Sequence, residues 1–165
     1  MVHLYYGMGK GKTTAAVGLA MRMAGAGGRV VFFSFLKDNS SSERLAMKGR
    51  VELIKGRESE KFFSQMTDAE KAEAREYYSE KLREIMAGCC CRDMIVLDEA
   101  GSAIDCGLID EEELIRLIDN VNAEVVLTAH EASQRLIDRC DYVTEMRKVK
   151  HPYDEGAPAR RGVEF

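Results

Sequence analysis

The residues with the clearest chemical potential lie near the start of the chain, in the run Gly7-Met8-Gly9-Lys10-Gly11-Lys12-Thr13-Thr14. Its three glycines have no Cβ atom, so backbone N–H groups can approach an anion closely. Lys12 supplies a positive charge and Thr13 a hydroxyl for Mg²⁺, and a helix that begins here directs its positive dipole end at the same anion. The run therefore predicts a phosphate-binding loop (P-loop) that binds a nucleotide triphosphate.

One position departs from the general P-loop pattern, which has a glycine five residues before Gly11, where this chain has Tyr6. The alternative interpretation is a glycine-rich turn that binds no ligand. The surroundings favour the phosphate loop, because an apolar strand is predicted at residues 2–6 and a helix rich in alanine and leucine at about 12–26.

A second chemical landmark is the apolar run 94–97, which ends in Asp98 and Glu99. A buried strand that ends in acids completes the Mg²⁺ site of P-loop proteins. Successive side chains of an extended strand point to opposite faces, so we expect one carboxylate to face the metal or its water shell and the other a neighbouring site. The alternative is a pair of solvated acids, and the upstream Thr13 favours the metal.

The elements that position these residues alternate along the chain. Strands are predicted at 2–6, 29–35, 51–54, 94–99, 123–128 and 142–146, and helices at 12–26, 67–87, 100–106, 110–121 and 133–140. This order predicts one α/β domain over residues 1–165, a three-layer P-loop NTPase-like fold with a mostly parallel sheet of about six strands. The ligand is then expected at the C-terminal ends of the strands.

Bulk properties narrow the class of protein. The net charge of −4 over 165 residues gives no argument for nucleic acid or an anionic membrane as a partner. No apolar run reaches the roughly 18 residues of a membrane-spanning helix, and the strand at the start leaves no room for a signal peptide, so we expect a cytoplasmic protein. Five cysteines, three of them adjacent at 89–91, make a poor disulfide framework and favour idle thiols over a metal site.

The chain resembles the ATP:corrinoid adenosyltransferases, and the resemblance covers nearly its whole length. At the C-terminal end it is carried by Val143-Thr144-Glu145-Met146, Lys150-His151-Pro152-Tyr153-Asp154, Gly156, Ala159, Gly162 and Glu164-Phe165. Elsewhere it is carried by Gly7 to Thr14 with Lys10 inside the loop, Ala15-Ala16, Gly18, Ala20, Arg22, Phe35-Leu36-Lys37, Glu43, Val96-Leu97-Asp98-Glu99 and Gly107-Leu108.

The resemblance implies that a Co(I) corrinoid attacks C5′ of ATP, forms a cobalt–carbon bond and releases triphosphate. Lys12, Lys10, the loop amides and Mg²⁺ (or Mn²⁺) would stabilise the leaving triphosphate. Thr13 and Glu99, with Asp98, would hold the metal, so the catalytic residues are Lys12, Thr13 and Glu99. Cobalt is the nucleophile and carries no proton, so no general base is needed.

The resemblance also implies contacts outside the loop. Nucleotide or corrinoid contacts are expected from Arg22, Phe62, His130, Lys150 and His151. His151 is alternatively a packed turn residue, and Phe62 and Phe63 are alternatively part of the core. The implied partners are ATP, a reduced corrinoid (cobalamin or a precursor), a flavoprotein reductase as electron donor and a second copy of the chain in a homodimer.

Some positions differ from the family pattern. Members commonly have Gln where Ser34 stands, Thr-Gly-Arg where Thr128-Ala129-His130 stands, and Phe-Thr-Trp where Phe62-Phe63-Ser64 stands. Two other functions therefore stay open. One is a different Mg–ATP-dependent enzyme, a kinase or an ATPase, and the other is a regulator that binds ATP and corrinoid without catalysis.

Overall fold

Six strands form one sheet in the computed structural model, which describes residues 1–37, 39–57 and 63–163. They are β1 (Val2–Tyr6), β2 (Val30–Ser34), β3 (Glu52–Leu53), β4 (Met94–Asp98), β5 (Glu124–Ala129) and β6 (Tyr142–Glu145). Their order across the sheet is β3-β2-β4-β5-β1-β6, and every neighbouring pair runs parallel. The sheet of the described residues is therefore all-parallel, where the sequence predicted a mostly parallel one.

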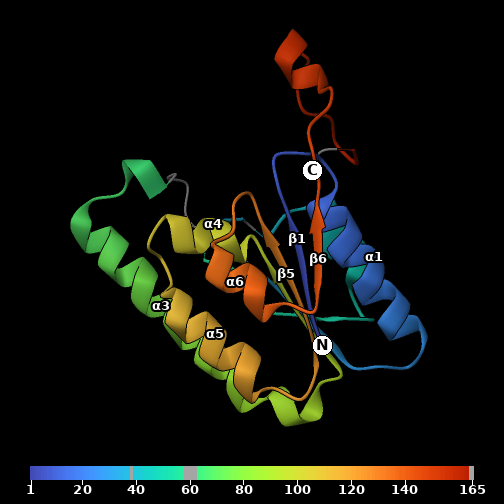
Figure 1. The fold of residues 1–165 in the computed structure, drawn as a ribbon, viewed down its shortest axis with the longest axis vertical. Helices are drawn as coiled ribbons and strands as arrows, with labels where there is room; N and C mark the ends of the chain where they lie inside the picture. Colours follow the sequence, from blue (N-terminus) through green and yellow to red (C-terminus); the bar gives the residue numbers. More distant parts are fainter. Residues whose placement is uncertain (38, 58–62, 164–165) are drawn as a thin grey trace.

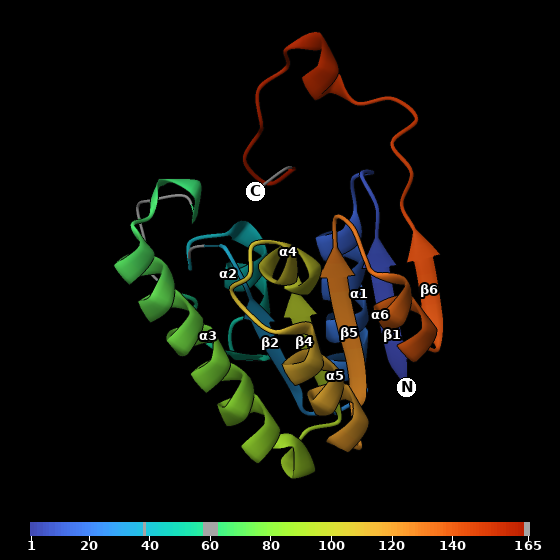
Figure 2. The ribbon, with the colours of Figure 1, turned by 60° about the vertical axis from the view of Figure 1, so that its left-hand side comes forward.

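Helices cover both faces of the sheet, as Figures 1 and 2 show. The helices are α1 (Lys12–Gly25), α2 (Ser42–Met47), α3 (Asp68–Ala87), α4 (Ala100–Asp105), α5 (Glu111–Asn120) and α6 (Gln134–Arg139). One apolar cluster contains buried residues of α1 and α2, and the other contains those of α3, α4, α5 and α6. The result is the three-layer arrangement expected from the alternation of strands and helices.

The central strands are apolar on both sides because both faces of the sheet are covered. Phe32 and Val96 belong to the cluster with α1, whereas the next residues along each strand, Phe33 and Leu97, belong to the cluster with α3 and α5. All four are fully buried. Full burial of such side chains contributes about 1.5–3 kcal/mol each to the stability of the fold. These strands therefore form a stable support for the residues at their C-terminal ends.

Local signals in the sequence set several helix boundaries. The predicted capping box at the start of α3 is present: the Glu70 carboxylate accepts from the Thr67 N–H at 2.7 Å, and the Thr67 hydroxyl accepts from the Glu70 N–H at 3.3 Å. Gly27, with φ of 88°, follows the end of α1. Helix α2 was not predicted, because six residues are too few for a helical period to be recognised.

The segment after β6 leads away from the sheet at the edge where β1, β4 and β5 end (Figures 1 and 2). The sequence predicted no regular structure here, and the structure adds one short 3₁₀ turn, Pro152–Glu155. Its residues are mostly exposed. None of the helices in the described part of the chain is long and apolar enough to span a membrane, and all five cysteines are free.

Candidate functional site

The phosphate loop follows β1 and is held by backbone hydrogen bonds to the exits of β5 and β6. Gly7 N donates to His130 O at 3.1 Å, and Gly9 N donates to Met146 O at 2.6 Å. A Cβ atom would lie 2.7 Å from Met146 O at Gly7 and 2.5 Å from it at Gly9, closer than packed atoms allow. Gly7 and Gly11 also have φ of 108° and 112°, a backbone region that favours glycine. Gly7 and Gly9 are therefore required by the packing of the loop against Met146, a role that the sequence did not reveal.

Lys12 is folded over its own loop. Its ammonium donates to Gly7 O at 2.7 Å and to Gly9 O at 2.9 Å, and only 7% of the residue is exposed. Burial lowers the pKa of Lys12 below its usual value, and the negative charge of Glu99 opposes that effect. The Lys12 ammonium, at the start of α1, is therefore hydrogen-bonded to two carbonyl oxygens of its own loop.

Asp98, at the end of β4, is the buried anion of the site. Its carboxylate is fully buried and accepts hydrogen bonds from three hydroxyl groups. Thr13 donates to Oδ1 at 2.9 Å, Thr128 donates to Oδ1 at 2.8 Å, and Ser34 donates to Oδ2 at 3.3 Å. These residues come from α1, β5 and β2, so the parallel sheet brings three distant segments to the one carboxylate at the end of β4.

Lys37 supplies the positive charge for this carboxylate. Its Nζ lies 2.7 Å from Asp98 Oδ2, 3.0 Å from Thr13 Oγ1 and 3.9 Å from Glu99 Oε1. Burial by itself lowers the pKa of Lys37, but the charge of Asp98 and the hydrogen bond to it outweigh burial, so the pKa is raised. Lys37 therefore stays protonated at neutral pH.

Glu99 lies just beyond β4 with φ of 60°. Its N–H donates to Thr128 Oγ1 at 2.7 Å, and its Oε2 accepts from Ser102 at 2.7 Å. The expectation that Asp98 and Glu99 face opposite ways assumed an extended strand through both residues. The left-handed backbone at Glu99 ends that alternation, and both carboxylates lie near the Lys37 ammonium.

Other predicted site residues border the loop without being buried. Met8, Lys10 and Thr14 are exposed on the loop and the first turn of α1. The His130 Nε2 atom lies 3.9 Å from Glu99 Oε2, with half of its side chain exposed. A cavity of about 470 Å³ lies between the loop and the exits of β5 and β6, and Gly7, Met8 and His130 are among its lining residues. Its volume is within the range of small-molecule sites.

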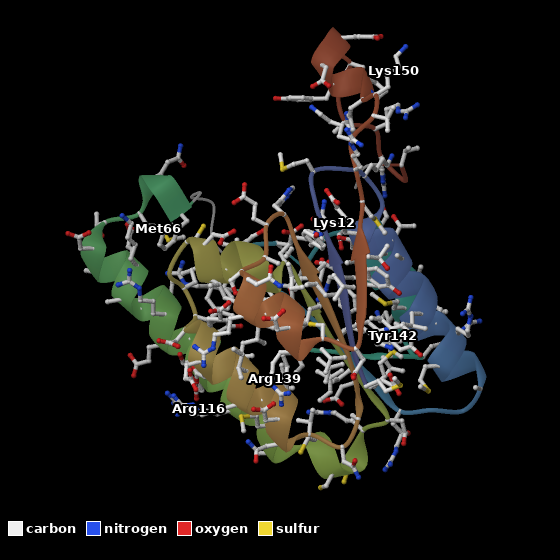
Figure 3. The ribbon with its side chains drawn as sticks, viewed as in Figure 1. Lys12, Met66, Arg116, Arg139, Tyr142 and Lys150 are labelled. Atoms are coloured by element: carbon white, nitrogen blue, oxygen red, sulfur yellow. The ribbon has the colours of Figure 1, made fainter. Side chains whose placement is uncertain are left out.

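The remaining predicted residues are not brought to the loop. Arg22 is in the last turn of α1, about 15 Å along the helix axis from Lys12. Lys150 lies far from Lys12 in the side-chain view (Figure 3), and its Nζ is 3.4 Å from Glu155 Oε1. His151 Nδ1 accepts from Tyr153 N at 3.2 Å, as in the turn interpretation. Phe62 lies outside the described residues, and Phe63 packs partly against the core beside α3.

Sequence reasoning did not identify Ser34, Lys37 and Thr128 as the partners of Asp98. Ser34, at the end of β2, pairs with Asp98 in the sheet. Thr128, near the end of β5, follows Leu127, which pairs with Leu97 on β4. A signal was present, since polar residues at the ends of buried strands meet at one edge of a parallel sheet. Using it required the strand order, which the sequence did not supply.

The donor set near Asp98 suits a small divalent ion. No group of three or more His, Cys, Asp or Glu side chains that could enclose a metal is found among the described residues. Mg²⁺ instead takes one or two carboxylates, a hydroxyl, waters and phosphate oxygens. Thr13, Asp98 and Glu99 offer that combination, and the Lys37 ammonium already lies within hydrogen-bond distance of two of them. The arrangement can therefore bind a cation next to a phosphate loop.

Comparison with known proteins assigns the family. The family model "ATP:corrinoid adenosyltransferase BtuR/CobO/CobP" matches residues 1–165. The chain is 27% identical over 169 residues to the corrinoid adenosyltransferase of Escherichia coli strain K12, with 100% of this chain and 85% of that protein covered. It is 32% identical over 181 residues to that of Sinorhizobium sp., with 96% and 77% covered.

Among solved structures, the chain was matched to AMPPCP-bound DnaA from Aquifex aeolicus, with a TM-score of 0.47 and 14% identity over 88% of this chain and 39% of that one. Domain III of the Thermotoga maritima replication initiation protein DnaA has a TM-score of 0.45 and 17% identity over 88% and 54%. The match of the family model over the whole chain confirms the resemblance inferred from the sequence. The chain belongs to the ATP:corrinoid adenosyltransferase family BtuR/CobO/CobP.

Proposed function

We propose that this corrinoid adenosyltransferase holds the triphosphate of ATP in its phosphate loop as the leaving group of an alkyl transfer. The Co(I) centre of the reduced corrinoid donates its electron pair to C5′ and becomes Co(III). The cobalt–carbon bond forms as the C5′–O5′ bond breaks, and triphosphate leaves with the bonding electrons. The observation that carries the proposal is the family match over residues 1–165, joined to a loop whose threonine donates to the buried Asp98 carboxylate and whose lysine donates to carbonyl oxygens of the loop.

Lys12 and the loop amides are the proposed clamp on the triphosphate. The Lys12 ammonium is bonded to two carbonyl oxygens of its own loop, and we infer that it exchanges them for phosphate oxygens. Lys10, exposed in the same loop, adds a second positive charge. Positive groups aimed at charge that grows on the leaving group lower the barrier more than they stabilise bound ATP.

Thr13, Glu99 and Asp98 would hold Mg²⁺ or Mn²⁺ beside the clamp. A bound divalent ion would neutralise part of the charge on the triphosphate. The Thr13 hydroxyl and the two carboxylates offer three oxygen donors, and phosphate and water would supply the others. Asp98 is already oriented by Thr128 and Ser34, so its position needs no rearrangement when the ligand arrives.

His130 and the cavity of about 470 Å³ beside the loop are the proposed location of the nucleoside part of ATP. The cavity adjoins Gly7 and Met8, so a nucleoside bound there can remain attached to phosphates in the loop. We place contacts to the corrinoid at Phe62, Lys150 and His151, as in the family resemblance. Arg22 stays a predicted ligand contact on the same ground.

The remaining partners are proposed from the family resemblance and from composition. They are a flavoprotein reductase that supplies Co(I), and a second copy of the chain in a homodimer. We also propose a cytoplasmic location. Sedimentation analysis tests the dimer directly, because a monomeric mass at micromolar protein concentration would contradict it.

The visible spectrum of chemically reduced cobalamin, recorded with the protein and Mg–ATP, tests the reaction. We expect the Co(I) spectrum to be replaced by that of an adenosylated corrinoid, with triphosphate as the phosphorus product. An ATPase or kinase would instead give ADP. A regulator would bind both ligands and leave the spectrum unchanged over hours. Either of these outcomes would overturn the proposal.

A further inference from the structure

Lys37 occupies a position that the proposed reaction does not explain. Its ammonium bridges the buried Asp98 carboxylate, at 2.7 Å, and the Thr13 hydroxyl, at 3.0 Å. These two residues are the proposed metal ligands on β4 and α1. A fully buried carboxylate needs a compensating positive charge, and the ion pair of Asp98 with Lys37 provides it.

The backbone just before Lys37 is strained. Leu36 has φ of 58°, a region that non-glycine residues rarely adopt. Its N–H donates to Tyr78 Oη at 3.4 Å, and the preceding Phe35 N–H donates to Asp98 O at 2.9 Å. Such strain persists where the surroundings enforce it, and it is found mostly at functional sites.

The far side of the same loop is also held. Asn39 makes two hydrogen bonds with Gly56, through Gly56 N at 2.8 Å and Gly56 O at 3.2 Å. A Cβ atom at Gly56 would lie 2.9 Å from Lys37 O, so this glycine lets the two loops approach each other. Contacts on both sides therefore hold Lys37 over the end of β4.

Lys37 and a divalent ion cannot share this position. An ion bound to Thr13 Oγ1 at about 2.1 Å would lie within about 5 Å of the Lys37 ammonium, because Nζ is 3.0 Å from the same oxygen. Like charges at that separation repel strongly in a partly buried site. This repulsion favours displacement of one cation when the other arrives.

We propose that Lys37 is a tethered cation that competes with a divalent ion for the oxygens of Asp98 and Thr13 and moves to the triphosphate when metal and nucleotide bind. The proposal rests on the proposed function in one respect only, which is that metal and nucleotide are the ligands that displace Lys37. It makes two predictions. The free protein binds a divalent ion weakly, because the ion must displace Lys37, and Lys37 adds a positive charge to the clamp once it is displaced.

The first test is the binding of Mn²⁺ alone, followed by electron paramagnetic resonance with no nucleotide or corrinoid. Lys37→Gln keeps a hydrogen-bond donor for Asp98 but removes the charge, and Lys37→Met removes both. We expect Mn²⁺ to bind about tenfold or more tightly to Lys37→Gln than to the unmodified protein, since no cation has to be displaced. Lys37→Arg, which keeps the charge, should bind Mn²⁺ as weakly as the unmodified protein.

Two controls test whether the gain in Mn²⁺ affinity is specific to the loss of the Lys37 charge beside Asp98. Lys48→Gln removes the same charge from an exposed lysine after α2 and should leave Mn²⁺ affinity unchanged. Adding Asp98→Asn to Lys37→Gln should abolish the gain. An unchanged or weaker Mn²⁺ affinity in Lys37→Gln, or an equal gain in Lys48→Gln, would overturn the proposal. Because the test contains neither ATP nor corrinoid, failure of the adenosyltransferase reaction would leave its result valid.

The second test measures binding of inorganic tripolyphosphate with Mn²⁺ by calorimetry. Here the order of affinities should reverse, and Lys37→Gln should bind the pair about tenfold more weakly than the unmodified protein, because the clamp has lost a charge. Equal affinity in the two proteins would refute the transfer of Lys37 to the triphosphate. Circular dichroism checks that the variants fold correctly. If Lys37→Met does not fold, the measurements on Lys37→Gln alone test the proposal.

Discussion

The backbone N–H of Gly9 donates to the carbonyl oxygen of Met146 at 2.6 Å, which ties the middle of the phosphate loop to the first residue after β6. The loop is therefore positioned by the strand at the edge of the sheet as well as by β1 and α1. The segment with Lys150 and His151 starts from the same residue. Any change that moves Met146 moves the loop.

Gly9→Ala is predicted to damage this junction. The new Cβ atom would lie 2.5 Å from Met146 O, so loop or strand must shift. We expect a loss of about 1–3 kcal/mol in the free energy of unfolding, typical of overpacking, together with weaker ATP binding. Urea unfolding and calorimetry measure the two effects.

The control is Gly18→Ala in the exposed part of α1, where a Cβ atom meets nothing within 4 Å. It should raise the free energy of unfolding by up to about 1 kcal/mol, because alanine favours a helix more than glycine does. Equal stability of the two variants would contradict the role of the Gly9–Met146 contact.

Lys12→Ala is predicted to remove the central charge of the clamp. We expect a fall in kcat/KM for ATP of about a hundredfold or more, the usual cost of losing a group that stabilises developing charge. The rate of cobalt–carbon bond formation measures it, and the exposed-lysine variant Lys48→Ala should keep its activity. Full activity in Lys12→Ala would reject the clamp.

Thr128→Val tests the support of the buried carboxylate. The hydroxyl of Thr128 donates to Asp98 and accepts from Glu99 N, and valine has the same shape without either bond. Leaving such buried groups with fewer partners costs about 1–3 kcal/mol of stability. Thr144→Val, on the exposed strand β6, should change it by less than about 0.5 kcal/mol. Similar values from urea unfolding of both variants would exclude a special role for Thr128.

Cys140 is predicted to react slowly and to make stability sensitive to alkaline pH. Burial raises the pKa of its thiol from 9.0 to about 11, and its Sγ donates to Leu136 O at 3.1 Å. At pH 8 we expect alkylation by iodoacetamide about a hundredfold slower than at the exposed Cys90 and Cys91, because the thiolate is the reactive form. Mass spectrometry of timed samples measures the rates, and equal rates would contradict the prediction.

The sign of the pH effect follows from the same shift. Between pH 9 and 11 the unfolded chain has lost the Cys140 proton while the folded chain keeps it, so stability falls as the pH rises through this window. Cys140→Ser should reduce that fall. An equally steep loss of stability in the variant would assign the effect to other groups.

Much of the fold was predictable because its signals are local. The strand before the phosphate loop, the capping box of Thr67 and Glu70 and the apolar run before Asp98 each depend on residues close in sequence. Helix α2 and the left-handed Leu36 and Glu99 were not predictable in this way. The first is too short to show a period, and the other two depend on tertiary contacts that enforce unfavourable backbone angles.

The sequence alone determined the acid-ended strand and the pattern of the corrinoid adenosyltransferases and predicted a phosphate loop, because those features are runs of neighbouring residues. Only the tertiary structure decided that Asp98 meets Thr13, Thr128, Ser34 and Lys37. The order of strands in a parallel sheet is set by the packing of whole βα units rather than by any short stretch. That strand order therefore also decides which positive charge, here Lys37, lies beside Asp98.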